Sequence, residues 1–323
     1  TSRVSSMKYM RLKPIPKQTI WGTNEVGRYF GYTDFPEDTG QTWCASARED
    51  GANVILDGPY AGMTLKGLWE THHELFQTES IRFPWIIGLV APSDDLSVQI
   101  HPDDAYTTAH HLSDTGKNEG WYFLKTTPDS TIVYGHTATT EKEFHQLMEE
   151  NRWDALLKKK SVKEEDFVYI PARTIHAMGK GVIVYEIQQN SNLTYRFYDY
   201  GRVDAKGNPR QLHTQEALAN IRIPFAEEHW PETVKVINGQ RIRTLISCPS
   251  FELTLIDVTG ELEFPMKNTF AVLSVLEGEG SVDDYPLQFG DHVLALGEET
   301  LHLQGTMKLM VCNEWRNNHV SER

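Results

Sequence analysis

Residues 96–104 (Leu-Ser-Val-Gln-Ile-His-Pro-Asp-Asp) constrain the fold more than any other stretch of the chain. Side chains two residues apart in a β-strand point the same way, so Ser97, Gln99 and His101 share one face. The apolar residues between them form the opposite face, which would pack into a core, and the proline ends the strand. A half-buried strand that presents glutamine and histidine at its exit can hold a divalent ion. The alternative is a polar strand end satisfied by hydrogen bonds.

Three further segments carry polar side chains that could complete such a site. Lys117 and Glu119 lie two residues apart where a loop opens an aromatic strand, and strand geometry would aim both the same way. A solvated surface ion pair is the alternative. An acidic turn, β-forming residues and a proline turn precede His176, which is the usual second-motif pattern of cupin barrels, small jelly rolls whose interior holds a metal. Alternation over residues 181–189 makes Glu186 either a proton carrier or a buried structural acid.

The acidic composition limits the partners of the chain. It has 31 Lys and Arg against 45 Asp and Glu, a formal net charge of −14. This excess argues against nucleic acid or an anionic membrane as a partner, and an anionic substrate would need a local cationic pocket. No apolar run approaches the roughly 20 residues of a membrane span, and we expect a cytoplasmic protein. Cys44, Cys248 and Cys312 are scattered without metal-ligand spacing, which predicts reduced, structural thiols.

The length of 323 residues and the order of strand signals predict two domains. We expect a metal-binding catalytic domain with helical insertions over residues 7–223, and a linker over 224–233. Evenly spaced strands and turns over 234–323 predict a second jelly roll. That half brings only His292 and His302 without a Gln-x-His pair, so we expect no metal in it.

Two helices are predicted from apolar residues at helical spacing. One covers residues 64–76. The clearest amphipathic helix covers residues 141–160, and its three final lysines suit the C-terminal end of a helix dipole.

These blocks together resemble type I mannose-6-phosphate isomerases of the short bacterial class, in the cupin superfamily. The resemblance covers most of residues 7–223 and, more weakly, the C-terminal barrel. It rests on the blocks at residues 83–84, 96–104, 116–122, 170–177 and 186–199. It implies a mainly β fold of two jelly-roll barrels, with a few helices inserted in and after the N-terminal one.

The resemblance also implies a set of site residues. The zinc ligands of the family match Gln99, His101, Glu119 and His176. One zinc ion per chain is expected, and the same ligands also accept other divalent transition metals. Residues implied in catalysis are Arg196, Glu186 and Lys117, and those implied in substrate binding are Ser97, Lys117 and Arg196.

The activity implied is the interconversion of mannose 6-phosphate and fructose 6-phosphate by proton transfer between C1 and C2, in a monomer or homodimer. Three positions depart from the family pattern: Gly88 replaces a lysine that helps to bind the phosphate, Gln41 replaces a glutamate, and Arg173 replaces a glycine. The alternatives are therefore an isomerase with little phosphate preference and a non-catalytic, metal-containing sugar-binding cupin. One hypothesis is that Arg173 reaches the pocket and replaces part of the phosphate contact; the other is that it points to solvent.

Overall fold

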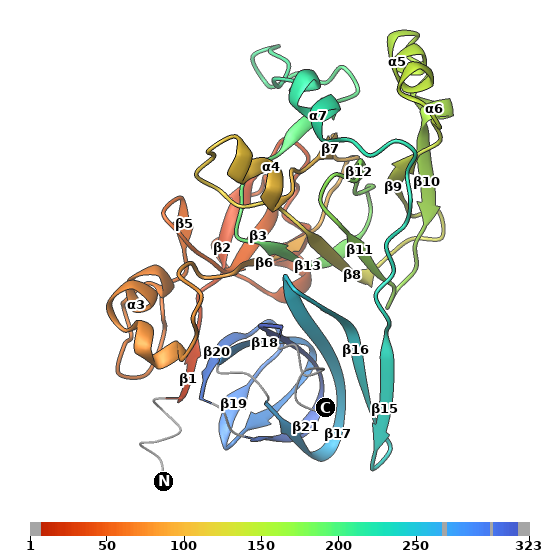
Figure 1. Ribbon diagram of the computed structural model, residues 1–323. Coiled ribbons are helices and arrows are strands. Elements are labelled where there is room, and N and C mark those ends of the chain that lie inside the picture. The colour runs from red at the N-terminus through yellow and green to blue at the C-terminus, as the bar shows by residue number, and fades with distance from the viewer. Residues whose placement is uncertain (1–7, 267–269, 298–299, 316–323) are drawn as a thin grey trace, which may run out of the picture.

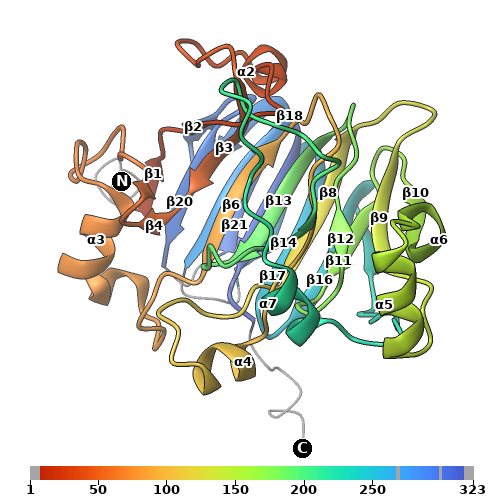
Figure 2. The ribbon, with the colours of Figure 1, turned by 90° about the horizontal axis from the view of Figure 1, so that it is seen from above.

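The computed structural model describes residues 8–266, 270–297 and 300–315 of a chain that is mainly β, as predicted. Two sheets form the N-terminal half and a third forms the C-terminal half. Figure 1 shows the two halves one above the other, with the helices at the periphery of the N-terminal half. In Figure 2, which is seen from above, the strands of the two halves overlap and run in similar directions.

The larger N-terminal sheet has six strands in the order β11-β8-β13-β6-β3-β2. Its strands are β2 (Ile15–Gln18), β3 (Thr39–Ala45), β6 (Trp85–Val90), β8 (Glu119–Lys125), β11 (Phe167–Ile170) and β13 (Ile183–Gln189). All six residues of β6 are buried, because β6 lies between β13 and β3 and both of its faces are covered. This position explains its continuous apolar run.

The second N-terminal sheet has five strands in the order β10-β9-β12-β7-β14. They are β7 (Val98–Ile100), β9 (Thr131–His136), β10 (Leu157–Ser161), β12 (His176–Ala177) and β14 (Tyr195–Tyr198). Gln99 in β7 stands opposite His176 on one side and Arg196 on the other. Three candidate positions that are far apart in the sequence therefore share one row of the sheet.

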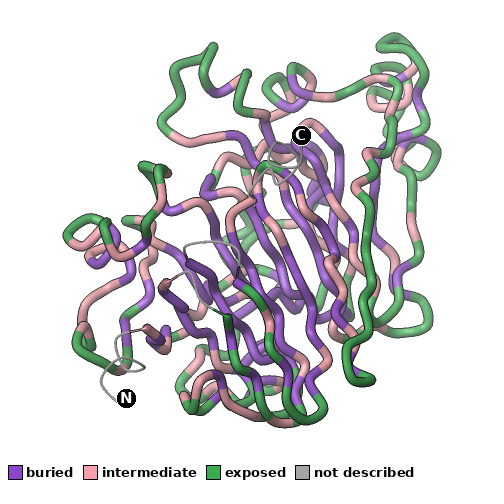
Figure 3. Tube along the Cα trace, turned by 60° about the horizontal axis from the view of Figure 1, so that its bottom comes forward, coloured by how far each residue is buried: buried purple, intermediate pink, exposed green. Residues whose placement is uncertain are grey.

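The C-terminal sheet has eight strands, and one of them comes from the start of the chain. The strands are β1 (Tyr9–Arg11), β15 (Thr233–Ile237), β16 (Gln240–Cys248), β17 (Phe251–Pro265), β18 (Phe270–Val282), β19 (Tyr285–Leu287), β20 (His292–Leu296) and β21 (Thr300–Asn313). β1 pairs with β20, so residues 9–11 join the sheet of the other half. One apolar core also contains residues of both halves, such as Leu89 and Leu253. Figure 3 shows the buried strands at the centre of the molecule. The division into domains at 224–233 stays a prediction.

The helices are short and lie outside the sheets. They are α2 (Glu25–Phe30), α3 (Leu65–Thr71), the 3-10 helix η1 (His73–Phe76), α4 (Asp104–Ala109), α5 (Glu141–Glu149), α6 (Trp153–Leu156) and α7 (Thr214–Asn220); a small hairpin joins β4 (Ala47–Arg48) and β5 (Gly51–Ala52). The helical prediction for residues 64–76 is confirmed in α3, but the helix ends at His72, which has φ −131°, and residues 73–76 form the separate 3-10 helix η1. Among the described residues, no helix has the length and apolarity to cross a membrane. The three cysteines are buried and free of disulfides, as predicted.

The prediction of one helix over residues 141–160 is wrong in its second half. α5 begins at its Thr140 cap and ends at Glu149, and Asn151 then adopts a left-handed backbone with φ 54°. The three lysines lie in strand β10, where Lys159 pairs with Val133 of β9. Pairing with β9, a strand earlier in the chain, has overridden the helical pattern of these residues. Sequence periodicity alone does not reveal such a pairing.

Candidate active site

A cleft of about 550 Å³ opens between the two N-terminal sheets. Seven of the eight residues predicted from the sequence line it: Ser97, Gln99, His101, Lys117, Glu119, Glu186 and Arg196. The eighth, His176, is fully buried against this group. The chain fold thus brings together all the predicted site residues, from β7, β8, β12, β13, β14 and the loops beside them.

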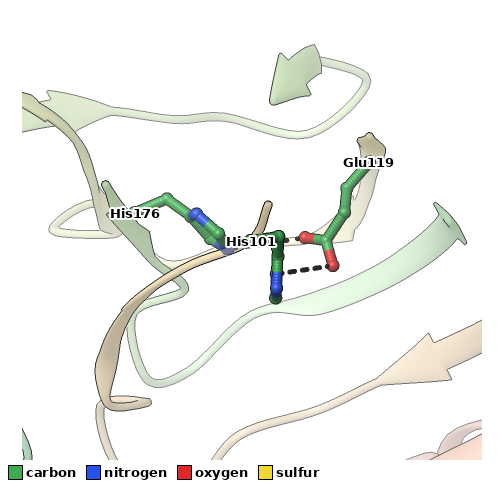
Figure 4. Close-up of side chains that lie close together, drawn as sticks. All are labelled: His101, Glu119 and His176. Atoms are coloured by element: carbon green, nitrogen blue, oxygen red, sulfur yellow. Dashed lines mark ion pairs between the residues drawn. The ribbon is translucent and has the colours of Figure 1, made fainter. Parts of the chain in front are cut away.

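His101, Glu119 and His176 form the metal-type cluster of the described residues, and their ligand atoms all lie within 4.8 Å of one another. Glu119 Oε1 lies 3.1 Å from His101 Nε2, and Glu119 Oε2 lies 3.5 Å from His176 Nε2. Figure 4 shows the two imidazoles and the carboxylate converging on one point. Three donors that converge in this way match the ligand number of a catalytic zinc site with an exchangeable position.

The imidazoles are oriented by the backbone. His101 Nδ1 lies 2.9 Å from Leu193 O, and His176 Nδ1 lies 2.8 Å from Thr174 O. A carbonyl oxygen can only accept, so each Nδ1 carries the proton and each Nε2 has a free lone pair. Both Nε2 atoms and Glu119 Oε2 are buried without a hydrogen-bond partner. Burying a polar atom without a hydrogen-bond partner costs free energy. A metal ion bound to all three atoms would remove this cost.

The protonation states of the cluster suit a cation. Burial acts to raise the pKa of Glu119, but the nearby imidazoles and the Lys117 ammonium lower it to about 2. Burial and the neighbouring His101 lower the pKa of His176 to about 4. At neutral pH the cluster therefore offers an ionised carboxylate and a neutral imidazole, which are the forms that bind metals. Gln99, the fourth predicted ligand, lies opposite His176 in the sheet and lines the cleft.

Glu186 is a buried carboxyl group held by two donors. Trp121 Nε1 donates to Oε2 at 2.8 Å, and Gln188 Nε2 donates to Oε1 at 2.7 Å. Burial and the charge of Glu119 raise the pKa of Glu186 from 4.5 to about 8. A carboxyl group with a pKa close to neutrality can both take up and return a proton under physiological conditions.

Two cationic side chains face the cleft, Lys117 from the loop before β8 and Arg196 from β14. Lys117 is buried, its Nζ donates to Ser191 O at 2.6 Å, and burial lowers its pKa. Arg196 Nη1 donates to Gln211 O at 3.0 Å, while its Nε is buried without a partner. Ser97 is buried beside them at the cleft wall. These groups can bind anionic or hydroxyl oxygens of a ligand.

The three departures from the family pattern have different surroundings. Arg173 does not line the cleft, and its Nε donates to Asn220 O, so the hypothesis that it reaches the pocket is wrong. The backbone of Arg173 has φ 70°, in the left-handed region that glycine adopts without strain. This conformation explains why the family pattern has a glycine where this chain has Arg173. Gln41 lines the cleft. A Cβ atom at Gly88 would lie 2.7 Å from Thr42 O.

The sequence prediction assigned no role to some residues of the cleft. Gln188 shares a strand face with Glu186, so alternation could have assigned it as a partner of that carboxyl group. Trp21 and Trp43 also line the cleft, as does Arg210, which lies in the loop between β14 and α7. A loop residue has no periodicity, and the sequence offered no signal for Arg210.

A buried His/Glu/His cluster in a cleft between two sheets of a β-fold is typical of a metal-binding protein of the cupin class. The family models agree. "Phosphomannose isomerase type I, catalytic domain" matches residues 9–120, and "Mannose-6-phosphate isomerase, cupin domain" matches residues 241–313. The chain is 40% identical over 294 residues to the mannose-6-phosphate isomerase ManA of Bacillus subtilis (strain 168), covering 88% of this chain and 93% of the relative.

Further relatives support the same assignment. The mannose-6-phosphate isomerase of Streptococcus mutans is 36% identical over 280 residues, which is 85% of this chain and 88% of the relative. The crystal structure of the Bacillus subtilis mannose 6-phosphate isomerase superposes with a TM-score of 0.90 at 36% identity, covering 95% of this chain and 99% of that one. A zinc-bound mannose 6-phosphate isomerase shares the fold at 14% identity, with a TM-score of 0.74 and coverage of 96% and 100%. The chain belongs to the mannose-6-phosphate isomerase family.

Proposed function

We propose that the protein is a zinc-dependent aldose–ketose isomerase that interconverts mannose 6-phosphate and fructose 6-phosphate. The observation that carries the proposal is the position of Glu186, a carboxyl group with a pKa near neutrality, in the same cleft as the His101, Glu119 and His176 cluster. An isomerisation of this type needs one group to move a proton between adjacent carbons and others to stabilise charge on their oxygens. Family membership supports the choice of substrate.

His101, Glu119 and His176 would hold the metal, with Gln99 as a further ligand. A divalent ion bound there can polarise the carbonyl and hydroxyl oxygens of the sugar or fix their orientation. Zinc suits nitrogen and oxygen donors, and the same donors also accept iron, cobalt, nickel or manganese. We propose one ion per chain.

Glu186 is the proposed proton-transfer group. Its two hydrogen bonds fix the carboxylate in the cleft, and its burial excludes water that would compete for the proton. Lys117 and Arg196 would stabilise the oxyanion that develops as the proton leaves carbon, or hold the phosphate, because charge-assisted hydrogen bonds are strong in a site shielded from solvent. Ser97, which also lines the cleft, would bind a hydroxyl group of the sugar. The cytoplasmic location and the choice between monomer and homodimer stay predictions.

Proton exchange at C2 of mannose 6-phosphate in deuterated water, followed by NMR, tests the proposal. The metal-loaded protein should incorporate deuterium at C2 and form fructose 6-phosphate. Exchange with mannose at the same efficiency would indicate an isomerase without phosphate preference. Binding of both sugars without exchange would leave a sugar-binding cupin.

A further inference from the structure

Residues 190–193, between β13 and β14, carry two backbone carbonyl groups that contact side chains of the site. Leu193 O lies 2.9 Å from His101 Nδ1, and Ser191 O accepts a hydrogen bond of 2.6 Å from Lys117 Nζ. One short segment therefore orients a proposed metal ligand and a proposed catalytic cation. Because a substitution cannot remove a backbone oxygen, the side chains that hold this segment decide where both oxygens lie.

A carboxylate and two guanidinium groups hold the segment. Asp114 Oδ2 accepts a hydrogen bond of 3.3 Å from Asn192 N. Arg48 Nη1 donates to Asn190 Oδ1 at 3.3 Å, and Arg82 Nη2 donates to Asn190 O at 3.1 Å. We call Asp114, Arg48 and Arg82 the anchor cluster, because together they contact the segment through its backbone and through a side chain.

Asp114 joins the two arginines of the anchor cluster. Its Oδ1 accepts hydrogen bonds from Arg48 Nη1 at 2.9 Å and from Arg82 Nη2 at 3.0 Å. The side chains of Arg48 and Asp114 are only 14% and 16% exposed. Burial acts to raise the pKa of Asp114, but the hydrogen bonds from both arginines lower it below its usual value. Charge-assisted hydrogen bonds that are shielded from water are stronger than those of an exposed ion pair.

The anchor cluster lies outside the catalytic cleft. Its three side chains line a separate pocket of about 310 Å³, together with Asn190. Asn192, two residues further along the chain, lines the catalytic cleft. The segment therefore lies between the anchor cluster and the cleft. Any effect of the cluster on the site must pass through the segment, since the cluster itself has no surface in the cleft.

We propose that Asp114 is a positioning residue of the active site, which acts with its two arginines through residues 190–193. By fixing this segment, the carboxylate fixes the oxygens that orient His101 and Lys117. The expected effect on turnover rests on the proposed function. The effect on the orientation of His101 does not, and it can be measured in the absence of any sugar.

The two imidazoles of the metal cluster provide an internal comparison. His101 Nδ1 contacts Leu193 O inside the segment, whereas His176 Nδ1 contacts Thr174 O outside it. In metal-free Asp114→Asn protein, NMR should show the His101 Nδ1 proton exchanging with solvent about 10-fold faster than in the parent, with the His176 proton within about twofold. A general loss of stability would accelerate both protons equally.

Zinc binding and turnover extend the test. Asp114→Asn should raise the zinc dissociation constant about 10-fold, a usual effect of disturbing the partner of a metal-binding histidine. At saturating zinc, kcat with mannose 6-phosphate should fall about 10- to 100-fold, because a displaced Lys117 meets the developing charge in the wrong position. Arg48→Gln should cause the same changes. The double variant should lose at most about twofold more than Asp114→Asn alone, because the two residues act as one unit.

Glu165→Gln is the matched control. Glu165 accepts hydrogen bonds from Arg241 Nη2 at 3.1 Å and from Lys308 Nζ at 2.9 Å, so this substitution also removes a carboxylate shared by two cations. Glu165 does not line the cleft, and within the described chain it makes no hydrogen bond to residues 190–193. The control should keep the zinc affinity, the exchange of both imidazole protons and kcat within about twofold of the parent.

Melting temperatures would verify that each variant is folded. Unchanged exchange of the His101 proton in both Asp114→Asn and Arg48→Gln would overturn the proposal, as would equal acceleration of the His101 and His176 protons. If the His101 proton and the zinc affinity respond as expected while the parent exchanges no sugar, the positioning role stands and the proposed isomerase function fails.

Discussion

Glu186→Gln is the most informative single substitution, because it removes the proposed proton carrier without removing a proposed metal ligand. Loss of a positioned general base slows proton transfer by about 10²- to 10⁴-fold, which corresponds to about 3 to 5 kcal/mol of transition-state stabilisation. The shape of the side chain is kept. However, Trp121 and Gln188 both donate to the carboxylate, and an amide offers only one acceptor oxygen. One buried donor then loses its partner, at a cost of about 1 to 3 kcal/mol of stability.

The assay is C2 exchange of mannose 6-phosphate together with the metal content of the same sample. Glu186→Gln should keep its metal and lose exchange, whereas Glu119→Gln should lose both, since Glu119 belongs to the cluster. A Glu186→Gln variant that retains metal and exchanges within about tenfold of the parent would refute the role of Glu186 as the base.

The pH dependence of the unfolding stability of the metal-free protein provides a second test of Glu186. The raised pKa of Glu186 means that the folded state keeps a proton which the unfolded state has lost between about pH 4.5 and about pH 8. Its contribution to stability is therefore complete below about pH 4.5 and is lost as the pH rises to about 8. Glu186→Gln removes this loss. The free energy of unfolding of the variant, measured with denaturant, should therefore rise relative to that of the parent from about pH 5 to about pH 8. A constant difference between the two proteins would show that the carboxyl group is not perturbed.

Three further tests by substitution follow from the structure. His101→Ala and His176→Ala together should abolish metal binding measured by elemental analysis, whereas His292→Ala should keep the metal; full occupancy in the double variant would reject the cluster. Arg173→Gly should relieve a left-handed backbone conformation, raise unfolding stability by up to about 1 kcal/mol and leave the KM for mannose 6-phosphate unchanged; a raised KM for this substrate alone would show that Arg173 binds phosphate. Gly88→Lys should lower stability by about 1 to 3 kcal/mol, because its Cβ would lie 2.7 Å from a backbone oxygen, and an unchanged melting temperature would contradict this close contact.

Local periodicity predicted the parts of the site that lie on strands. The two-residue repeat of β7 placed Gln99 and His101 on one face, and both line the cleft. The same repeat placed Glu186 and Gln188 together on β13. The acidic turn, strand and proline turn before His176 predicted that residue, and the resemblance to a family added Arg196. Both stand beside Gln99 in the sheet through pairings that no local pattern encodes.

Features that depend on contacts between distant segments could not be predicted in this way. The three lysines at the end of the predicted helix form a strand because β9 offers a partner. β1 joins the C-terminal sheet through β20. Arg210 enters the cleft because Asp199 and the loop before α7 position it. In each case the deciding interaction is a tertiary contact, which local secondary-structure propensity does not predict.

Titration of the metal-free protein with zinc, while C2 exchange of mannose 6-phosphate is followed by NMR, tests the central claim most directly. The buried Nε2 atoms of His101 and His176 and the Oε2 atom of Glu119 are the unsatisfied groups that the ion would bind. The exchange rate should rise in proportion to added zinc and level off at about one equivalent per chain. Full exchange in the metal-free protein, or none at one bound equivalent, would contradict a metal-dependent isomerase at this cleft.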